Sequence, residues 1–189
     1  MAPILGIFAS SQQGAGAATS FESIATVSVG SGGAADIEFT SIPGTYSHLQ
    51  VRGISRISES QLEQGLWLRM NGDTASNYAF HGLVGNGSSA TAFGYATQSR
   101  IEGPDAPGAS ATASVFGAHI FDILDYANTN KYKTVRVLTG VDRNGGGGIR
   151  LVSGLWQSTS AITSLKFTVN GGTNFVQYSH FALYGIKGA

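Results

Sequence analysis

Ser164-Leu-Lys-Phe-Thr-Val-Asn-Gly171 alternates apolar and polar side chains and then ends in a turn sequence. Leu165, Phe167 and Val169 share one face of an extended chain, because successive side chains of a strand point to opposite sides. The Asn-Gly pair supplies the positive φ angle that a tight reversal of the chain requires. The stretch therefore predicts a half-buried β-strand that ends at a turn.

The same alternation recurs along the chain from Phe21 onward. Turn sequences of the Pro-Gly and Asn-Gly type separate the alternating runs, which predicts nine to eleven short strands. We therefore expect an all-β protein, an antiparallel β-sandwich of jelly-roll-like form with an extended N-terminal arm. The apolar positions that define the runs are Ile37, Phe39, Leu49, Val51, Leu66, Leu68, Met70, Val135, Val137, Phe181 and Leu183.

Three segments interrupt this pattern. Residues 103–114 are rich in Gly, Pro, Ala and Ser and predict a long surface loop. Residues 58–64 and residues 121–128 each predict a single helical turn, since neither has the length of a stable amphipathic helix. Gly30-Ser-Gly-Gly33 resembles the start of a phosphate-binding loop but opens no helix, and we interpret it as a hairpin turn.

Residues 1–20 form a separate unit before the predicted β-sandwich domain of residues 21–189. Met1 to Ala9 is apolar, and a spacer of Gln, Gly, Ala and Ser follows it. We expect an anchor that docks on a partner subunit through four side chains, Ile4, Leu5, Ile7 and Phe8. Alternatively, this arm packs on its own domain or frays as a terminus.

Composition narrows the classes of partner. Charged residues make up 12% of the chain, and its 11 basic and 11 acidic residues cancel, so no basic field exists to hold nucleic acid. Cysteine is absent from the sequence, which excludes thiolate catalysis and cysteine-based zinc sites. No apolar run has the length of a membrane helix, so we expect no membrane insertion. A sparsely charged, Gly-rich chain is typical of a protein that works within an assembly.

Catalytic and metal-binding motifs are not found. The sequence lacks the spacings of zinc proteases, serine hydrolases, P-loops and calcium loops, and the acid pairs that could face across a cleft fall on predicted loops or short turns. We expect no catalytic residues, no metal site and no cofactor. The histidines are scattered, without the close spacing of paired metal ligands: His48, His81, His119 and His180.

One polar segment followed by aromatic residues suggests a sugar-binding surface. Saccharides bind where an aromatic face meets amide and carboxylate groups. The candidate glycan-binding residues are Trp67, Asn71, Asp73, Asn77, Tyr78 and His81. Alternatively, the segment is a hairpin whose Asn and Asp side chains satisfy their own backbone, while Tyr78 and Phe80 cover the edge of the core.

Several motifs together resemble a group of uncharacterised tailed-bacteriophage virion proteins. They span nearly the whole chain, although each one alone has low specificity. The motifs are Met1-Ala-Pro-Ile-Leu-Gly-Ile-Phe-Ala-Ser-Ser11, Phe39-Thr-Ser-Ile-Pro-Gly-Thr-Tyr-Ser-His-Leu-Gln-Val-Arg52, Leu68-Arg-Met-Asn-Gly-Asp73 with Asn77-Tyr78, Asp122-Ile-Leu-Asp-Tyr126 with Lys131-Tyr-Lys-Thr134, Gly154-Leu-Trp-Gln-Ser-Thr-Ser-Ala-Ile-Thr-Ser-Leu165, and Asn174-Phe175 with Ser179-His-Phe-Ala-Leu-Tyr-Gly-Ile-Lys187.

The resemblance implies a non-enzymatic structural protein of the virion, on the phage tail or the capsid surface. We expect a tail fibre or receptor-binding component that binds other virion proteins through the N-terminal arm. Fibres and spikes have closed cyclic symmetry, so we expect a homo-oligomer, with a trimer as the first choice. The alternatives are a capsid decoration protein and a carbohydrate-binding module that recognises a host surface glycan.

Overall fold

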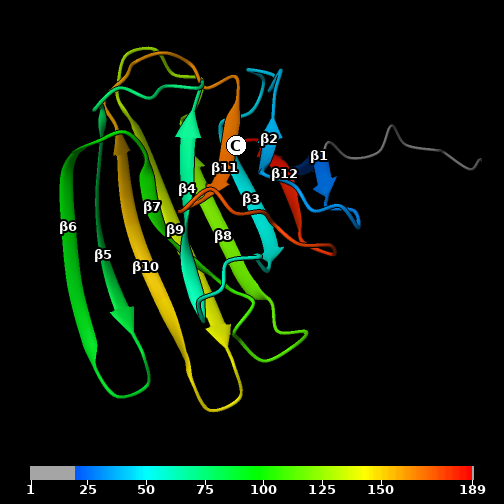
Figure 1. The fold of residues 1–189 in the computed structure, drawn as a ribbon. Helices are drawn as coiled ribbons and strands as arrows, with labels where there is room; N and C mark the ends of the chain where they lie inside the picture. Colours follow the sequence, from blue (N-terminus) through cyan, green and yellow to red (C-terminus); the bar gives the residue numbers. More distant parts are fainter. Residues whose placement is uncertain (1–19, 189) are drawn as a thin grey trace, which may run out of the picture.

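The protein is a two-layered β-structure, which we describe from a computed structural model for residues 20–188 (Figure 1). Strands hydrogen-bond to their neighbours in antiparallel fashion throughout both layers. The twelve strands are β1 (Phe21–Ser28), β2 (Asp36–Phe39), β3 (His48–Ser55), β4 (Glu63–Met70), β5 (Tyr78–Gly85), β6 (Ala90–Gln98), β7 (Ile101–Pro107), β8 (Gly117–Leu124), β9 (Lys133–Asp142), β10 (Gly147–Trp156), β11 (Leu165–Val169) and β12 (His180–Ile186).

The two sheets differ in size. The large sheet has eight strands in the order β1-β12-β3-β8-β9-β10-β5-β6, and the small sheet has four in the order β2-β11-β4-β7. This arrangement confirms the predicted β-sandwich, with one strand more than the upper limit expected from the sequence. The anchor residues Ile4, Leu5, Ile7 and Phe8 lie outside the described residues.

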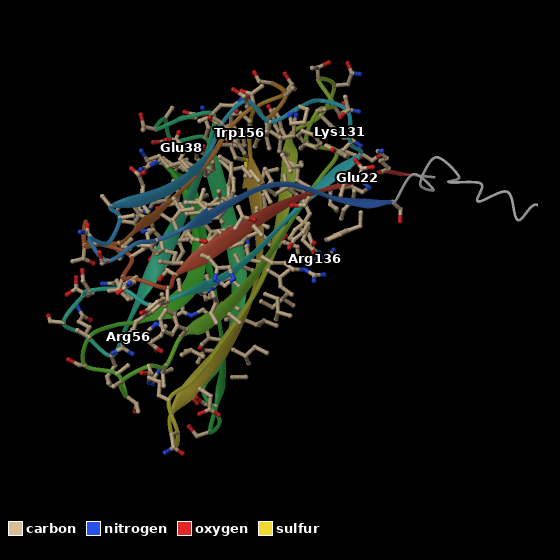
Figure 2. The ribbon with its side chains drawn as sticks, turned by 90° about the vertical axis from the view of Figure 1, so that its right-hand side faces the viewer. Glu22, Glu38, Arg56, Lys131, Arg136 and Trp156 are labelled. Atoms are coloured by element: carbon tan, nitrogen blue, oxygen red, sulfur yellow. The ribbon has the colours of Figure 1, made fainter. Side chains whose placement is uncertain are left out.

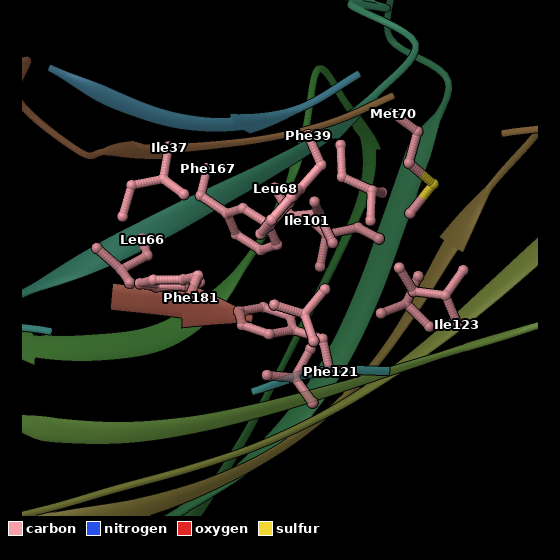
Figure 3. Close-up of a cluster of buried hydrophobic side chains, with 14 of the residues drawn as sticks. Ile37, Phe39, Leu66, Leu68, Met70, Ile101, Phe121, Ile123, Phe167 and Phe181 are labelled. Atoms are coloured by element: carbon pink, nitrogen blue, oxygen red, sulfur yellow. The ribbon is translucent and has the colours of Figure 1, made fainter. Parts of the chain in front are cut away.

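The core lies between the two sheets and follows the alternation seen in the sequence. In β11, Leu165, Phe167 and Val169 are buried, whereas Lys166 and Thr168 between them are partly exposed. Figure 3 shows residues of β2, β4 and β11 facing residues of β8 and β12 across this interior. Burying one face of each sheet stabilises both layers, because apolar area is removed from water on both sides of the contact.

Aromatic rings form the centre of the contact between the sheets. Phe167 of the small sheet lies 4.9 Å from Phe121 and 5.1 Å from Phe181 of the large sheet, measured between ring centroids. Phe181 also lies 5.8 Å from Phe175, edge to face. Such ring pairs stabilise beyond the area that they bury.

The Asn-Gly turns have the backbone conformation that their sequence predicts. Asn71 and Gly72 have φ angles of 52° and 66°, and Asn144 and Gly145 have 61° and 109°. Gly87 and Gly171 are also in the left-handed region, at 89° and 95°. The segment that begins at Gly30 also turns, but it joins β1 of the large sheet to β2 of the small sheet, so it is not the loop of a β-hairpin.

The predictions for residues 58–64, 103–114 and 121–128 also need correction. Residues 101–107 form β7, so the surface loop begins at residue 108, five residues later than the predicted start at residue 103. A strand at the edge of a sheet tolerates proline, because one side of its backbone has no strand to pair with. Gly103 also lets this strand approach the large sheet, since a Cβ there would lie 2.5 Å from Val152. Residues 60–62 form bends, and residues 121–124 belong to β8 and are followed by a turn at residues 125–127, so neither segment is helical.

A buried histidine lies at the edge of the aromatic cluster. His119 on β8 is fully buried, with its ring 5.9 Å from that of Phe181 and nearly parallel to it. Both ring nitrogens have hydroxyl partners at 2.8 Å, Ser55 for Nε2 and Thr139 for Nδ1. Burial lowers the pKa of His119 to about 3, because the charged imidazolium would lose its hydration.

Phe181 tests the importance of the aromatic contact. Phe181→Ala should reduce the free energy of unfolding by about 3–5 kcal/mol, since it removes a buried ring and leaves a cavity between the sheets. Urea unfolding followed by intrinsic fluorescence measures the change. A loss of less than about 1 kcal/mol would contradict the central place given to this ring.

The lowered pKa of His119 predicts that the free energy of unfolding depends on pH. The unfolded histidine titrates near pH 6.5 and the folded one near 3. Between pH 6.5 and pH 3, His119 binds a proton in the unfolded chain but not in the folded one. The free energy of unfolding is therefore highest above pH 6.5 and falls as the pH approaches 3, by up to about 1.4 kcal/mol per pH unit. Urea unfolding at several pH values should show a flatter profile for His119→Gln than for the unaltered chain. Parallel profiles would refute the prediction.

Candidate functional site

The polar residues of the predicted glycan surface mainly hold the backbone in place. Asn71 donates from Nδ2 to the carbonyl of Ala161 at 2.8 Å, and its Oδ1 accepts from the backbone amides of Thr163 and Ser164. Asp73 accepts hydrogen bonds from the amide of Ala75, from Asn77 and from the indole of Trp156. These bonds tie Ala75, Asn77 and Trp156 to the turn that contains Asp73.

The other members of the predicted surface lie on different faces of the molecule. Tyr78 is fully buried, and its ring stacks on Trp156 at 6.3 Å. Trp67 is on the outer side of the small sheet, and His81 is on the outer side of the large sheet. The structure therefore does not bring the six residues onto one surface. The segment joins β4 of the small sheet to β5 of the large sheet, so it is not the hairpin of the alternative interpretation. Its Asn and Asp side chains do bond to the backbone, and Tyr78 and Phe80 are buried, as that interpretation expected.

The outer side of the large sheet carries a patch of apolar side chains. Register places Ile120, Leu138, Leu151 and Leu83 in one row across four neighbouring strands, β8, β9, β10 and β5. Ile149 lies two residues along β10 from Leu151, on the same side. We call these five residues the outer patch. Leu83, Leu138, Ile149 and Leu151 are each between 44% and 56% exposed, which is high for side chains of this kind.

A polar row borders the outer patch. Gln50, Asp122, Arg136, Ser153 and His81 face one another across five strands, one step along the sheet from the row of leucines. Figure 2 shows Arg136 projecting outward from this side of the molecule, beside side chains made almost entirely of carbon. A rim of polar groups around exposed apolar side chains is typical of a surface that another protein covers.

The outer side of the small sheet has the opposite character. Lys166 of β11 pairs with Asp36 at 2.8 Å and approaches Glu38 at 3.8 Å, both on β2. Trp67 of β4 lies beneath the guanidinium of Arg100, 3.9 Å from its carbon to the ring centroid. Charged and paired side chains therefore cover this side, whereas the outer side of the large sheet exposes the apolar outer patch.

A crevice opens where the chain crosses from β6 of the large sheet to β7 of the small sheet. The small sheet ends at β7, so the inner side of β6 has no strand opposite it. Figure 1 shows β6 at the far side of the large sheet from β1. The crevice has a volume of about 450 Å³ and is lined by Phe80, Phe93, Tyr95, Gln98, Arg100, Glu102, Arg150 and Asn170.

Ion pairs hold the charged groups around the crevice. Glu102 accepts from Arg100 at 3.2 Å and from the indole nitrogen of Trp67 at 3.1 Å. Arg150 pairs with Asp105, a largely buried carboxyl. Burial raises the pKa of Asp105 to about 6, against the lowering effect of the Arg150 charge. Outside the lining of the crevice, Glu63 pairs with Arg143.

Within residues 20–188, no group of three or more His, Asp or Glu side chains is placed to hold a metal ion. No helix among the same residues is long and apolar enough to span a membrane. Comparison with protein-family models, with curated proteins and with solved structures finds no match to this chain.

Sequence reasoning missed both of these surfaces for identifiable reasons. The alternation of β9 correctly placed Val135 and Val137 inside, but Leu138 then falls on the side expected to be polar. That apolar residue on a polar side was the available signal for the outer patch. The crevice depends on residues from β5, β6, β7 and β10, and on the end of the small sheet at β7. No local pattern in the sequence encodes that ending.

Proposed function

We propose that the chain is a non-enzymatic structural subunit of a tailed-phage virion, namely a tail fibre or receptor-binding component that assembles with copies of itself. The outer patch carries this proposal. Four large apolar side chains exposed on adjacent strands are unfavourable in water, and a covering subunit removes them from it. The assignment to a phage particle is supported by the resemblance of the motifs to tailed-phage virion proteins.

A second copy of the chain fits the outer patch by its charge pattern. Asp122 and Arg136 stand side by side in the polar row, and Arg136 is exposed. In a cyclic trimer the outer sides of three large sheets face the symmetry axis, and Arg136 of one copy meets Asp122 of the next. Since basic and acidic residues are equal in number, the copies do not repel one another.

The ion pairs around the crevice support a non-enzymatic role. A carboxyl group that acts as a general acid or base has to exchange a proton with the substrate. Glu102, Asp105 and Glu63 are each engaged by an arginine instead. These pairs fix the position of the side chains, as expected of a surface built for stability or binding.

The oligomeric state tests assembly through the outer patch. We expect a trimer at micromolar concentration, and we expect Leu138→Lys to convert it to a folded monomer because three lysines would meet at the axis. Leu62→Lys is the matched control, since Leu62 is 54% exposed in the loop before β4 and lies outside the outer patch. Sedimentation velocity gives the mass and circular dichroism the fold. The proposal would be contradicted if the unaltered chain were a monomer, or if the Leu138→Lys variant remained a trimer.

Immunogold labelling of intact phage particles with an antibody against this chain tests the place on the virion. We expect gold at the tail, because the proposal assigns the chain to a fibre or receptor-binding component. Gold over the head would contradict the tail assignment and favour a decoration protein. Particles without gold at either place would contradict a virion role.

A further inference from the structure

The β6–β7 crevice is preformed by the unequal size of the two sheets. β5 and β6 continue the large sheet past the edge of the small sheet, while β7 packs against β5, β9 and β10. The inner side of β6 therefore faces open space instead of a fifth strand. A hollow of about 450 Å³ lies within the usual size range of ligand pockets in proteins.

One wall of the crevice is aromatic. The ring of Phe80 lies 6.2 Å from Phe93 and 5.3 Å from Tyr95, and the rings of Phe93 and Tyr95 lie 6.2 Å apart. Phe80 is buried, whereas Tyr95 is 54% exposed, so the buried ring supports the exposed one. This cluster presents an apolar ring with a polar hydroxyl to anything that enters the crevice.

A glycine seats the middle ring of this wall. Gly82 pairs with Phe93 across the β5–β6 ladder, and a Cβ at Gly82 would lie 2.4 Å from the tip of the Phe93 ring. The ring therefore lies flat against the backbone of β5, as only glycine permits at such a distance. The aromatic wall is thus fixed before any ligand arrives, which reduces the entropic cost of binding.

The rest of the crevice wall, with residues from β6, β7 and β10, offers hydrogen-bonding groups that are already held in place. Arg100 is fixed between Glu102 and the ring of Trp67, and Arg150 is fixed by Asp105. Gln98 adds a side-chain amide. Each guanidinium has a carboxylate partner, so this wall presents donors and acceptors with little net charge. A phosphate-bearing ligand such as an oligonucleotide would find no unpaired cation among these groups.

We propose that the β6–β7 crevice binds a neutral saccharide. The apolar side of a sugar ring stacks on Tyr95, and its hydroxyl groups exchange hydrogen bonds with Glu102, Gln98 and the guanidinium groups of Arg100 and Arg150. Directed polar groups facing an aromatic wall recognise a molecule that is apolar on one side and rich in hydroxyls at its edge. This inference does not require the chain to belong to a virion or to form a trimer.

A glycan array tests the proposal. The probe is a set of neutral hexose and N-acetylhexosamine oligosaccharides printed beside sialylated, sulfated and uronic-acid oligosaccharides. Binding to neutral members is expected, with the affinity for the strongest then measured by calorimetry. Binding restricted to the anionic members, or to none, overturns the proposal.

Substitution of the aromatic wall locates the binding site. Tyr95→Ala should weaken binding of the strongest neutral oligosaccharide by about tenfold, the loss expected when one stacked ring is removed. Tyr132→Ala is the matched control, because Tyr132 is similarly exposed at 52% and lies in the loop before β9. Full binding by Tyr95→Ala would overturn the assignment to the crevice.

Trp67 supplies an independent readout, since it contacts both Arg100 and Glu102. Sugar binding should change tryptophan fluorescence, and Trp67→Phe should abolish that change, whereas buried Trp156 reports little of it. A fluorescence change that persists in Trp67→Phe would place the sugar elsewhere. Sedimentation of the same variants separates this test from that of the outer patch, because Tyr95 is not part of the patch.

Discussion

The packing of the Phe167 ring against the rings of Phe121 and Phe181 is the interaction on which the rest of the structure depends. These rings join the small sheet to strands β8 and β12 of the large sheet. The large sheet has water on its other side, so this single interior is where most of its apolar burial takes place. The turns, the ion pairs and the crevice keep their positions only while the two layers remain packed.

Because the two sheets differ in size, the small sheet covers only part of the large sheet. Four strands cannot cover eight, and β5 and β6 extend past the edge formed by β7. The inner side of this extension becomes the crevice, with aromatic residues that would otherwise be core. The outer side becomes part of the outer patch, which contains Leu83 of β5. Most of the outer patch, however, lies on β8, β9 and β10, whose inner sides the small sheet covers, so the unequal sheets explain the crevice alone.

The sequence predicted the fold better than the site. Alternation in segments such as Leu165–Val169 is a local property, and it correctly gave the strands, their buried side and the Asn-Gly turns. β7 was missed because its Gly and Pro residues are typical of loops, and only its position at a sheet edge lets it form a strand. The glycan residues were misplaced because the pattern around Asn71 and Asp73 looks the same whether it binds a sugar or its own backbone.

The open edge of the large sheet has a consequence for how the chain behaves before assembly. The strand at this edge, β6, has nine residues, Ala90–Gln98, and none of them is charged or is a proline. Its free backbone donors and acceptors are a template on which another extended segment can add. A newly made chain is therefore open to aggregation through this edge, at a rate that rises with its concentration in the cell.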